Sequence, residues 1–152
     1  MAKKEVYLNC RKKLDLTRDQ ASELLEVISV DRLERIENGR IDPTPSDIKI
    51  MSEKYKNPSL CNYYCTHECD IGKEYVPEVQ IKNISQIVLE TLSAVNRIRE
   101  NQYRLIDITL DGQITNDELR DFIRIKHDLD FISTTIDSLQ LCKRKIMICN
   151  LY

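Results

Sequence analysis

The order of apolar and polar residues near the N-terminus predicts two short helices joined by a tight turn. Thr17 and Ser29 are each placed to cap the backbone N–H groups at the start of a helix. Asn38-Gly39 is typical of a helix end, and residues 26–28 supply the turn between the helices. Apolar positions recur at helical spacing after each cap: Ala21, Leu24 and Leu25 in the first segment, and Val30, Leu33 and Ile36 in the second.

The second half of the chain has the apolar pattern of two long amphipathic helices. The short link around Gly112 implies that they fold back as an antiparallel hairpin. Apolar residues outside the two seams leave each helix with more apolar surface than one partner covers, so we expect a second copy to complete a four-helix bundle. Packing of the hairpin on the N-terminal domain is the alternative. The predicted seams step by three and four residues: Ile81, Ile84, Val88, Thr91, Val95, Ile98, Gln102 and Leu105, then Phe122, Ile125, Leu129, Ile132, Ile136 and Leu139.

Several residues of the N-terminal segment follow the order found in one known family. They are Leu14 and Leu16 at the end of the family's first helix, Ala21 in its second helix, Val27 in the turn, Leu33 and Ile36 on its recognition helix, and Glu37, Asn38, Gly39, Arg40 and Pro43 beyond. This order resembles the Cro and phage-repressor (XRE) helix-turn-helix family over about residues 6–56, and implies a bundle of four or five short helices. Where the family usually has glycine in the turn, this chain has Glu26. Because glycine favours a left-handed backbone there, a strained or differently shaped turn is expected.

The resemblance implies that the second of the two helices reads DNA. In the family, the outward positions of this helix face base edges and phosphates in the major groove. Arg32 or Arg35 could donate two hydrogen bonds to guanine, and Val30 could touch a thymine methyl group. Residues at the start of the preceding helix and just past the recognition helix are placed for backbone phosphates. The DNA-binding residues implied are Thr17, Arg18, Ser29, Val30, Asp31, Arg32, Arg35, Asn38 and Arg40.

The charge balance of the N-terminal segment is not that of a strong DNA-binding protein. Residues 1–56 carry 12 Lys and Arg against 11 Asp and Glu, a net charge of +1, whereas strong DNA binders usually show a clear basic face. Asp31, Glu34 and Glu37 on the second helix would repel phosphates. We therefore expect modest non-specific affinity, with dimerisation supplying much of the binding energy. The alternative is a protein-interaction adaptor or inhibitor that uses the same helical fold without DNA.

Composition places the chain among soluble, helical proteins. Its 152 residues are 41% apolar and 32% charged, with 3 glycines and no tryptophan. No apolar run approaches the ~20 residues of a membrane helix, and the N-terminus lacks the apolar core of a signal peptide. We therefore expect a cytoplasmic protein that does not enter a membrane. His67 and His127 lie far apart and no nucleophile motif flanks either, so we expect no enzymatic activity and no cofactor.

Cys61, Cys65 and Cys69 are spaced by four residues, with His67 between the last two. By ligand type they could hold zinc or an iron-sulfur cluster. The other interpretations are a redox pair or small apolar side chains packed under neighbouring tyrosines, since free cysteine is among the most buried residue types. We favour packing, because ligands spaced by four along one short helix do not readily surround a tetrahedral ion. No metal is therefore predicted.

Residues 107–118 fit an EF-hand calcium loop at several positions, with Glu118 as the closing acid. Thr109 is a poor replacement for a carboxylate at the third position. The alternative explains the same residues as a turn. Gly112 ends one helix in a left-handed conformation, and Thr115 with Glu118 forms a capping box that starts the next. We favour the turn.

The sequence thus predicts an all-α protein with three parts. Residues 1–56 form a lambda-repressor-like helix-turn-helix domain, residues 57–77 a cysteine-containing joint, and residues 78–152 a C-terminal antiparallel helical hairpin that dimerises. The predicted function is a sequence-specific transcriptional regulator that binds double-stranded DNA at a palindromic operator as a homodimer.

Overall fold

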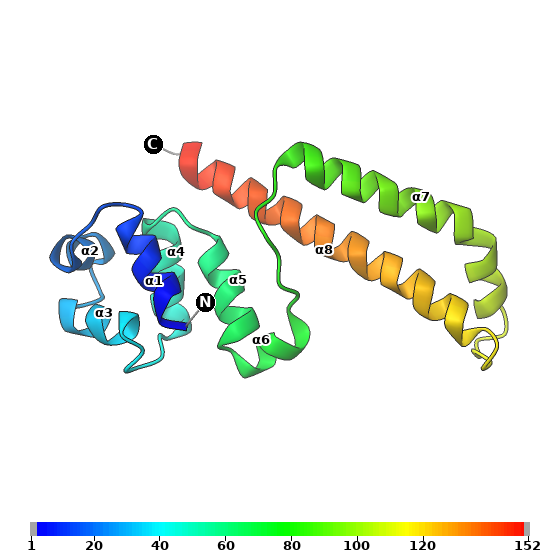
Figure 1. Cartoon of the computed structure of the whole chain (residues 1–152), viewed down its shortest axis with the longest axis horizontal. Helices are drawn as coiled ribbons and strands as arrows, with labels where there is room; N and C mark the ends of the chain where they lie inside the picture. Colours follow the sequence, from blue (N-terminus) through cyan, green and yellow to red (C-terminus); the bar gives the residue numbers. More distant parts are fainter. Residues whose placement is uncertain (1–2, 151–152) are drawn as a thin grey trace. The chain divides into compact units, whose positions relative to one another are not determined.

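The computed structural model describes residues 3–150, with side chains within residues 5–148. Every regular element in this described part is an α-helix (Figure 1), which confirms the predicted all-α class. The chain divides into two compact units, Met1–Glu78 with Arg144–Tyr152, and Val79–Lys143. The three-part division at 1–56, 57–77 and 78–152 stays a prediction. The helices are α1 (Lys3–Lys12), α2 (Arg18–Leu25), α3 (Val30–Glu37), α4 (Pro45–Lys54), α5 (Ser59–His67), α6 (Asp70–Tyr75), α7 (Ile84–Thr109) and α8 (Leu119–Asn150).

One apolar core holds the first unit together, and it draws on every helix from α1 to α5. The partly buried side chains of Tyr63 and Tyr64 on α5 pack against this core, together with Cys61. Residues of the predicted joint therefore bury apolar surface against the same core as α2 and α3, which stabilises the unit. The core residues are Tyr7, Cys10, Ala21, Leu25, Ile28, Leu33, Ile36, Ile48, Met51, Tyr55 and Leu60.

The predicted ends of α2 and α3 are confirmed. The Thr17 hydroxyl accepts a hydrogen bond from the Gln20 backbone N–H, and the Gln20 side chain accepts one from the Thr17 N–H. Ser29 caps α3 by accepting from the Arg32 N–H at 3.3 Å. At the other end Asn38 is the C-cap, and Gly39 has φ of +62°, where glycine carries no steric penalty.

The turn between α2 and α3 has an unusual backbone at Glu26. Its φ is +62° and ψ is −47°, and the Val27 N–H donates to the Leu25 carbonyl at 2.7 Å. These features describe a three-residue γ-turn with positive φ, which is rare and strained for a residue with a side chain. The turn shifts the apolar pattern by one position. Val27, which the family resemblance matched to the apolar turn residue, is 69% exposed, and Ile28 is 1% exposed.

Helices α5 and α6 approach closely at Gly72. A Cβ atom on Gly72 would lie 2.2 Å from the backbone carbonyl oxygen of Cys65, so only glycine fits without a shift of the helices. The sulfur of Cys69 caps α6 by accepting from the Gly72 N–H at 3.4 Å.

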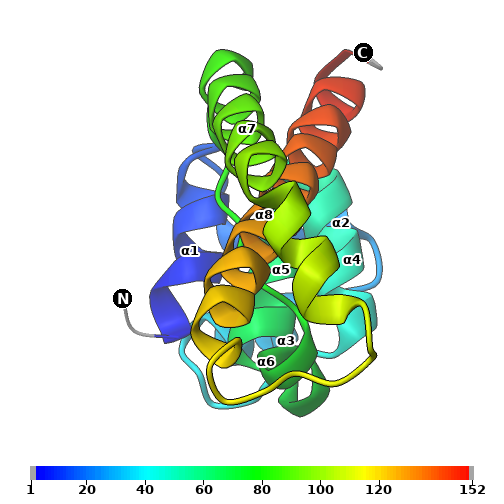
Figure 2. The same ribbon diagram turned by 90° about the vertical axis from the view of Figure 1, so that its right-hand side faces the viewer.

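Helices α7 and α8 form an antiparallel hairpin, in which the two long helices lie side by side (Figure 2). Their contact surface is mixed. Ile87, Ala94 and Ile108 of α7 are buried, as is Ile125 of α8. Ionic and polar pairs cross between the helices: Arg97 Nε donates to Asp128 at 2.6 Å, Arg104 Nε to Asp121 at 2.8 Å, and Arg124 to Asn101 at 3.1 Å.

Most of the predicted seam residues lie beside the helix contact, because each helix is rotated about its axis. Most contact positions lie one residue before a predicted seam residue, for example Ala94 before Val95 and Asp128 before Leu129, while Ile125 is a predicted seam residue and is buried. The rotation brings the arginines of α7 onto the aspartates of α8, a pairing that apolar periodicity alone does not contain. Ile98 and Ile132 are half-buried. Six predicted seam residues are 44–47% exposed: Ile84, Val88, Val95, Leu129, Ile136 and Leu139.

The link between α7 and α8 has the structure of a turn and a helix cap. Gly112 has φ of +73°. The backbone N–H and the hydroxyl of Thr115 both donate to Oε2 of Glu118, at 3.0 and 2.7 Å, and the first of these bonds is one half of a capping box. The Glu118 N–H donates to the Thr115 carbonyl instead of to its hydroxyl, so the predicted capping box forms only in part. Among the described residues, no helix has the length and apolar character needed to cross a membrane.

Candidate nucleic-acid interface

The candidate interface centres on α3, whose inner face is fixed by burial. Leu33, Ile36 and Glu37 are at most 2% exposed. Since residues three and four apart share one side of a helix, the opposite side of α3 is left at the surface. The exposed residues at the start and along the outside of α3 are Ser29, Val30, Asp31 and Arg35.

A buried ion network holds the C-terminal end of α3. The Glu37 carboxylate accepts hydrogen bonds from Arg11 Nε at 2.6 Å, from Arg11 Nη2 at 2.9 Å and from Arg18 Nε at 2.9 Å. The Glu37 side chain is 0% exposed and that of Arg11 is 10% exposed. Glu37 therefore joins α3 to α1 and to α2. Arg18, for which a phosphate contact stays a prediction, also links α2 to α3 in this structure.

The comparisons with known proteins assign this part of the chain. Residues 9–59 match a family model described as helix-turn-helix. This segment is a Cro/C1-type helix-turn-helix domain. The family is one of DNA-binding regulatory domains and is not an enzyme family. Neither the comparison with curated proteins nor the comparison with solved structures gives a match.

A second ion pair fixes the N-terminal half of the recognition helix of this domain. Arg32 donates to both carboxylate oxygens of Asp47 on α4, at 2.5 and 3.3 Å. Asp47 also accepts from the backbone N–H and the hydroxyl of Thr44. Burial alone would raise the pKa of Asp47, but Arg32 and Thr44 hold it below its ordinary value. The Arg32 guanidinium is thus partly neutralised and oriented toward α4.

The remaining predicted site residues differ in how firmly they are held. Arg35 is half exposed, and its Nη1 lies 3.9 Å from Asp31, one helical turn away. Such an exposed pair contributes little energy and exchanges readily with other partners. Asn38 donates to Glu34 at 3.3 Å, and Arg40 is exposed. Among the arginines of α3, Arg35 is therefore more available for a ligand than Arg32.

Val27 is a surface residue that the apolar pattern of the sequence does not indicate. It lies two residues before Ser29 and is 69% exposed, while Val30 in the first turn of α3 is 37% exposed. Two exposed apolar side chains at the start of a recognition helix are suited to contact thymine methyl groups. The sequence feature that could have indicated this exposure is Glu26, the residue that stands in the turn where the family usually has glycine. The turn at Glu26 shifts the buried apolar position from Val27 to Ile28.

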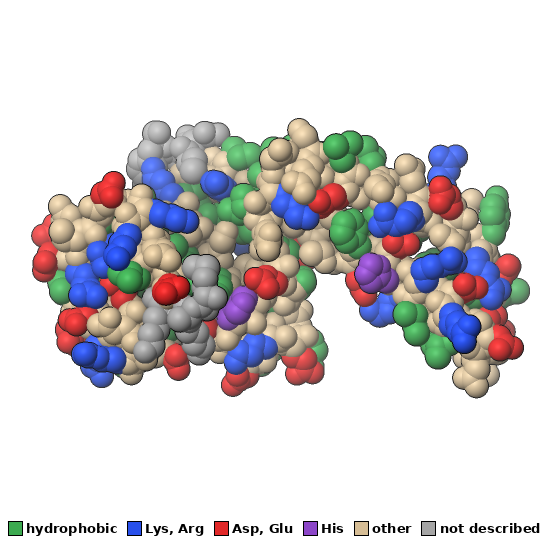
Figure 3. Space-filling model, viewed as in Figure 1, with side chains coloured by type: hydrophobic (Ala, Val, Ile, Leu, Met, Phe, Trp, Pro, Cys, Tyr) green, Lys and Arg blue, Asp and Glu red, His purple; other side chains and the backbone are tan. Residues whose placement is uncertain are grey.

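The surface of the first unit carries both signs of charge. In the view of Figure 3, basic and acidic side chains are interspersed over α1 to α6 and do not gather by sign. This mixture agrees with the net charge of +1 over residues 1–56. Long-range attraction to DNA is therefore weak, and affinity depends on specific contacts.

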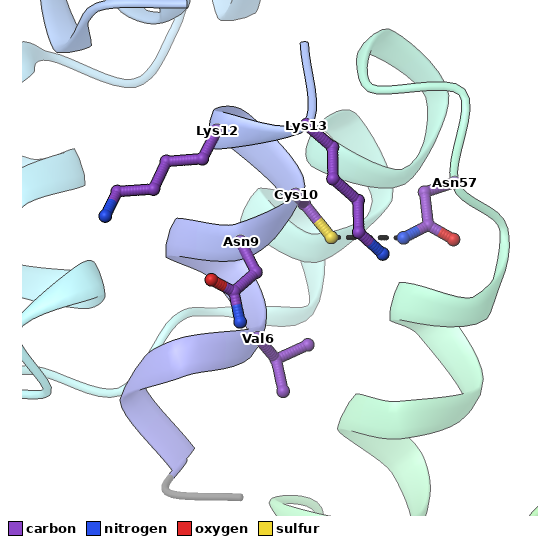
Figure 4. Close-up of a pocket in the computed structure, with 6 residues that line it drawn as sticks. All are labelled: Val6, Asn9, Cys10, Lys12, Lys13 and Asn57. Atoms are coloured by element: carbon purple, nitrogen blue, oxygen red, sulfur yellow. Dashed lines mark hydrogen bonds between the residues drawn. The ribbon is translucent and has the colours of Figure 1, made fainter. Parts of the chain in front are cut away.

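An open pocket lies between α1 and the start of α5 (Figure 4). The thiol of Cys10 lies 3.0 Å from Nδ2 of Asn57, and Lys12 points away from both. Burial raises the pKa of the Cys10 thiol, so it is a poor nucleophile at neutral pH. The pocket does not have the chemistry of a catalytic site. Its lining residues are Val6, Asn9, Cys10, Lys12, Lys13 and Asn57.

The three cysteines of the second unusual motif lie on α5 and at the start of α6. Cys61, Cys65 and Cys69 are half-buried. Burial raises the pKa of the Cys65 thiol, which favours the protonated form over the thiolate that a metal needs. Across the described residues, no group of three or more His, Cys, Asp or Glu side chains has the arrangement of a metal site. The structural roles found here are packing for Cys61 and capping for Cys69.

Proposed function

We propose that this protein is a sequence-specific transcriptional regulator that binds a palindromic DNA operator as a dimer. The main support is the outer face of α3 in a helix-turn-helix domain, where Val30, Asp31 and Arg35 are exposed on a helix with a buried inner face. A helix held in this way can enter the major groove without rearrangement. Arg35 donates to a guanine, while Val27 and Val30 contact thymine methyl groups.

Within this proposal, the candidate DNA-binding residues have two roles. Thr17, Ser29, Asn38 and Arg40 contact the backbone, which sets the position of α3 on the duplex. Arg18 and Arg32 act mainly through the orientation of α3, since each is paired with an acid of the domain. Base discrimination then falls chiefly on Arg35.

Selection from random DNA duplexes at low salt tests the proposal. We expect enrichment of an inverted repeat whose half-sites lie about one or two helical turns apart. Replacing Arg35 with alanine should weaken binding to the selected site by about 1–3 kcal/mol and relax the preference at one base pair. Lys12→Ala is the matched control, because Lys12 is an exposed cation on α1. Failure to enrich any sequence, or equal binding by the Arg35→Ala variant, would contradict the proposal.

A protein-interaction adaptor is the second candidate function. The acidic residues Asp31 and Glu34 on α3, together with the interspersed charges of Figure 3, favour it. An adaptor of this kind would enrich no DNA sequence at any salt concentration. The same selection experiment therefore separates the two functions.

A further inference from the structure

The hairpin of α7 and α8 has an apolar face that lies outside the contact between the two helices and is exposed. We define the apolar face by six side chains that are each 44–47% exposed: Ile84, Val88 and Val95 of α7, and Leu129, Ile136 and Leu139 of α8. Hydrophobic side chains are visible at the surface along the hairpin (Figure 3). A contiguous apolar surface of this kind is typical of an interaction site.

The residues from both helices lie on the same side of the hairpin. Val95 follows the buried Ala94 of the helix contact by one position, and Ile136 follows the buried Thr135 in the same way. One step along a helix is a rotation of about 100°. Because α7 and α8 are antiparallel, equal steps past the contact turn both side chains toward the same side. The apolar face is therefore one surface made by two helices.

The apolar face is uncharged over its length. The stripe on α7 continues through Thr91, Ile98, Gln102 and Leu105, and the stripe on α8 through Phe122 and Ile132. The other side of the hairpin differs, since Glu100, Asp107, His127 and Asp130 are exposed there. An uncharged apolar surface offers nothing to a charged partner such as DNA or an acidic peptide, but it complements another apolar surface of the same shape.

The size of the apolar face fits self-association. From Ile84 to Gln102 it extends about 27 Å along α7, and two adjacent helices make it about 20 Å wide. Two such faces would bury roughly 1,000 Å² or more between them, the range in which specific interfaces begin. A two-fold axis through the face would bring α7 and α8 of each chain into one four-helix bundle.

The composition of the contact inside the hairpin also points to a further layer. Ala94, Thr135 and the Arg97–Asp128 pair occupy positions between α7 and α8 together with Ile87, Ile108 and Ile125, while six further aliphatic side chains lie on the apolar face. An isolated pair of helices that leaves so many aliphatic side chains outside its contact is poorly stabilised by burial. Covering the apolar face would supply the missing core.

We propose that a second copy of this chain packs on the apolar face, and that the resulting four-helix bundle is the dimer interface. This inference deepens the proposed function, because it supplies the dimer that a palindromic operator requires. The interface does not itself depend on DNA, so the two proposals fail separately.

Sedimentation velocity of the full chain at tens of micromolar concentration tests this interface. We expect the wild type to give a molar mass of twice the single-chain value of 17.9 kDa. Val95→Asp and Ile136→Asp should each sediment at the single-chain mass, because a buried carboxylate has no partner there. The matched controls are Asn96→Asp and His127→Asp, exposed positions away from the apolar face, which should remain dimeric. A monomeric wild type, or dimers that persist in both face variants, would overturn the proposal.

A photo-crosslinking measurement guards against variants that fail to fold. A benzophenone amino acid in place of Ile136 should produce a covalent species of twice the chain mass on illumination, and the same group in place of His127 should not. A crosslink from position 136 that stays within one chain would show that another part of the same chain covers the face, and would refute the second copy as its occupant. If the protein is a dimer but does not bind DNA with sequence specificity, the proposed interface is supported and only the proposed function is refuted.

Discussion

Replacing Glu37 with alanine removes a carboxylate that joins three helices of the helix-turn-helix domain. Glu37 accepts three hydrogen bonds from Arg11 and Arg18, and its side chain is 0% exposed. Without it, the Arg11 guanidinium, which is 10% exposed, keeps only the backbone carbonyl of Leu16 at 2.7 Å as an acceptor. Leaving a buried charge unpaired costs about 3–5 kcal/mol. This is a large part of the 5–15 kcal/mol that stabilises a typical domain.

Amide hydrogen exchange is the suitable assay, because it reports the opening of α1 and α3 themselves in a chain that has two compact units. The free energy of opening measured at amides of α1 and α3 should fall by about 3–5 kcal/mol in Glu37→Ala. Arg18→Ala should cost only about 1 kcal/mol, since that side chain is 34% exposed and water replaces part of its interaction.

A double substitution separates the loss of the ion pair from the loss of packing. Changing both Arg11 and Glu37 to methionine removes the charges together and fills a similar volume, so stability should return close to that of the wild type. If the free energy of opening in Glu37→Ala is within about 1 kcal/mol of the wild-type value, or if the double variant is less stable than Glu37→Ala, the ion network does not stabilise the domain.

Three other perturbations test separate features of the fold. Gly72→Ala should lower stability by roughly 1–3 kcal/mol in thermal denaturation, because its Cβ would meet the Cys65 carbonyl oxygen at 2.2 Å. Gly112→Ala is its control, because a Cβ atom on Gly112 would have no atom within 4 Å and would add only the strain of a positive φ. Equal losses of stability in the two variants would contradict the close approach of α5 and α6 at Gly72. Glu26→Gly should melt at a higher temperature than Glu26→Ala, because only glycine relieves the φ of +62° while both lose the pair with Lys54; the opposite order would show an unstrained turn. The lowered pKa of Asp47 contributes stability that is fully present above the unfolded value of about 3.9 and is lost as pH falls through the folded value. Urea midpoints should therefore decline less steeply below about pH 4 in Asp47→Asn than in the wild type, and parallel declines would contradict this.

Features set by neighbouring residues could be predicted from the sequence. The caps at Thr17 and Ser29 and the end of α3 at Gly39 were found because a cap involves groups only two or three residues away. The family resemblance was visible for the same reason, since its spacing is local. All-α class and the helical hairpin followed from periodicity and from the lack of interruptions.

Features that depend on distant residues could not be predicted in this way. Arg18 and Arg32 looked available for DNA, yet their partners lie 19 and 15 residues away in the chain. Nothing in a helical pattern indicates which exposed-looking arginine will find such an acid. The rotation of α7 against α8 was missed for a related reason: pairing Arg97 with Asp128 selects one helix face over a more apolar one.

The two ion pairs of α3 together limit which residues can discriminate between DNA sequences. Glu37 holds the last turn of the helix to α1 and α2, and Arg32 holds an earlier turn to α4. With both held, α3 has little freedom to roll in a groove, and its outer face presents Asp31 and Arg35 in one fixed arrangement. Asp31 repels phosphates and at the same time is the partner of Arg35 at 3.9 Å. A base that replaces this partner must offer two acceptors in the plane of the guanidinium, as guanine does. A phosphate must approach against the charge of Asp31. If the proposed function is correct, the acidic residue that lowers affinity for DNA in general therefore raises the ratio of specific to non-specific binding.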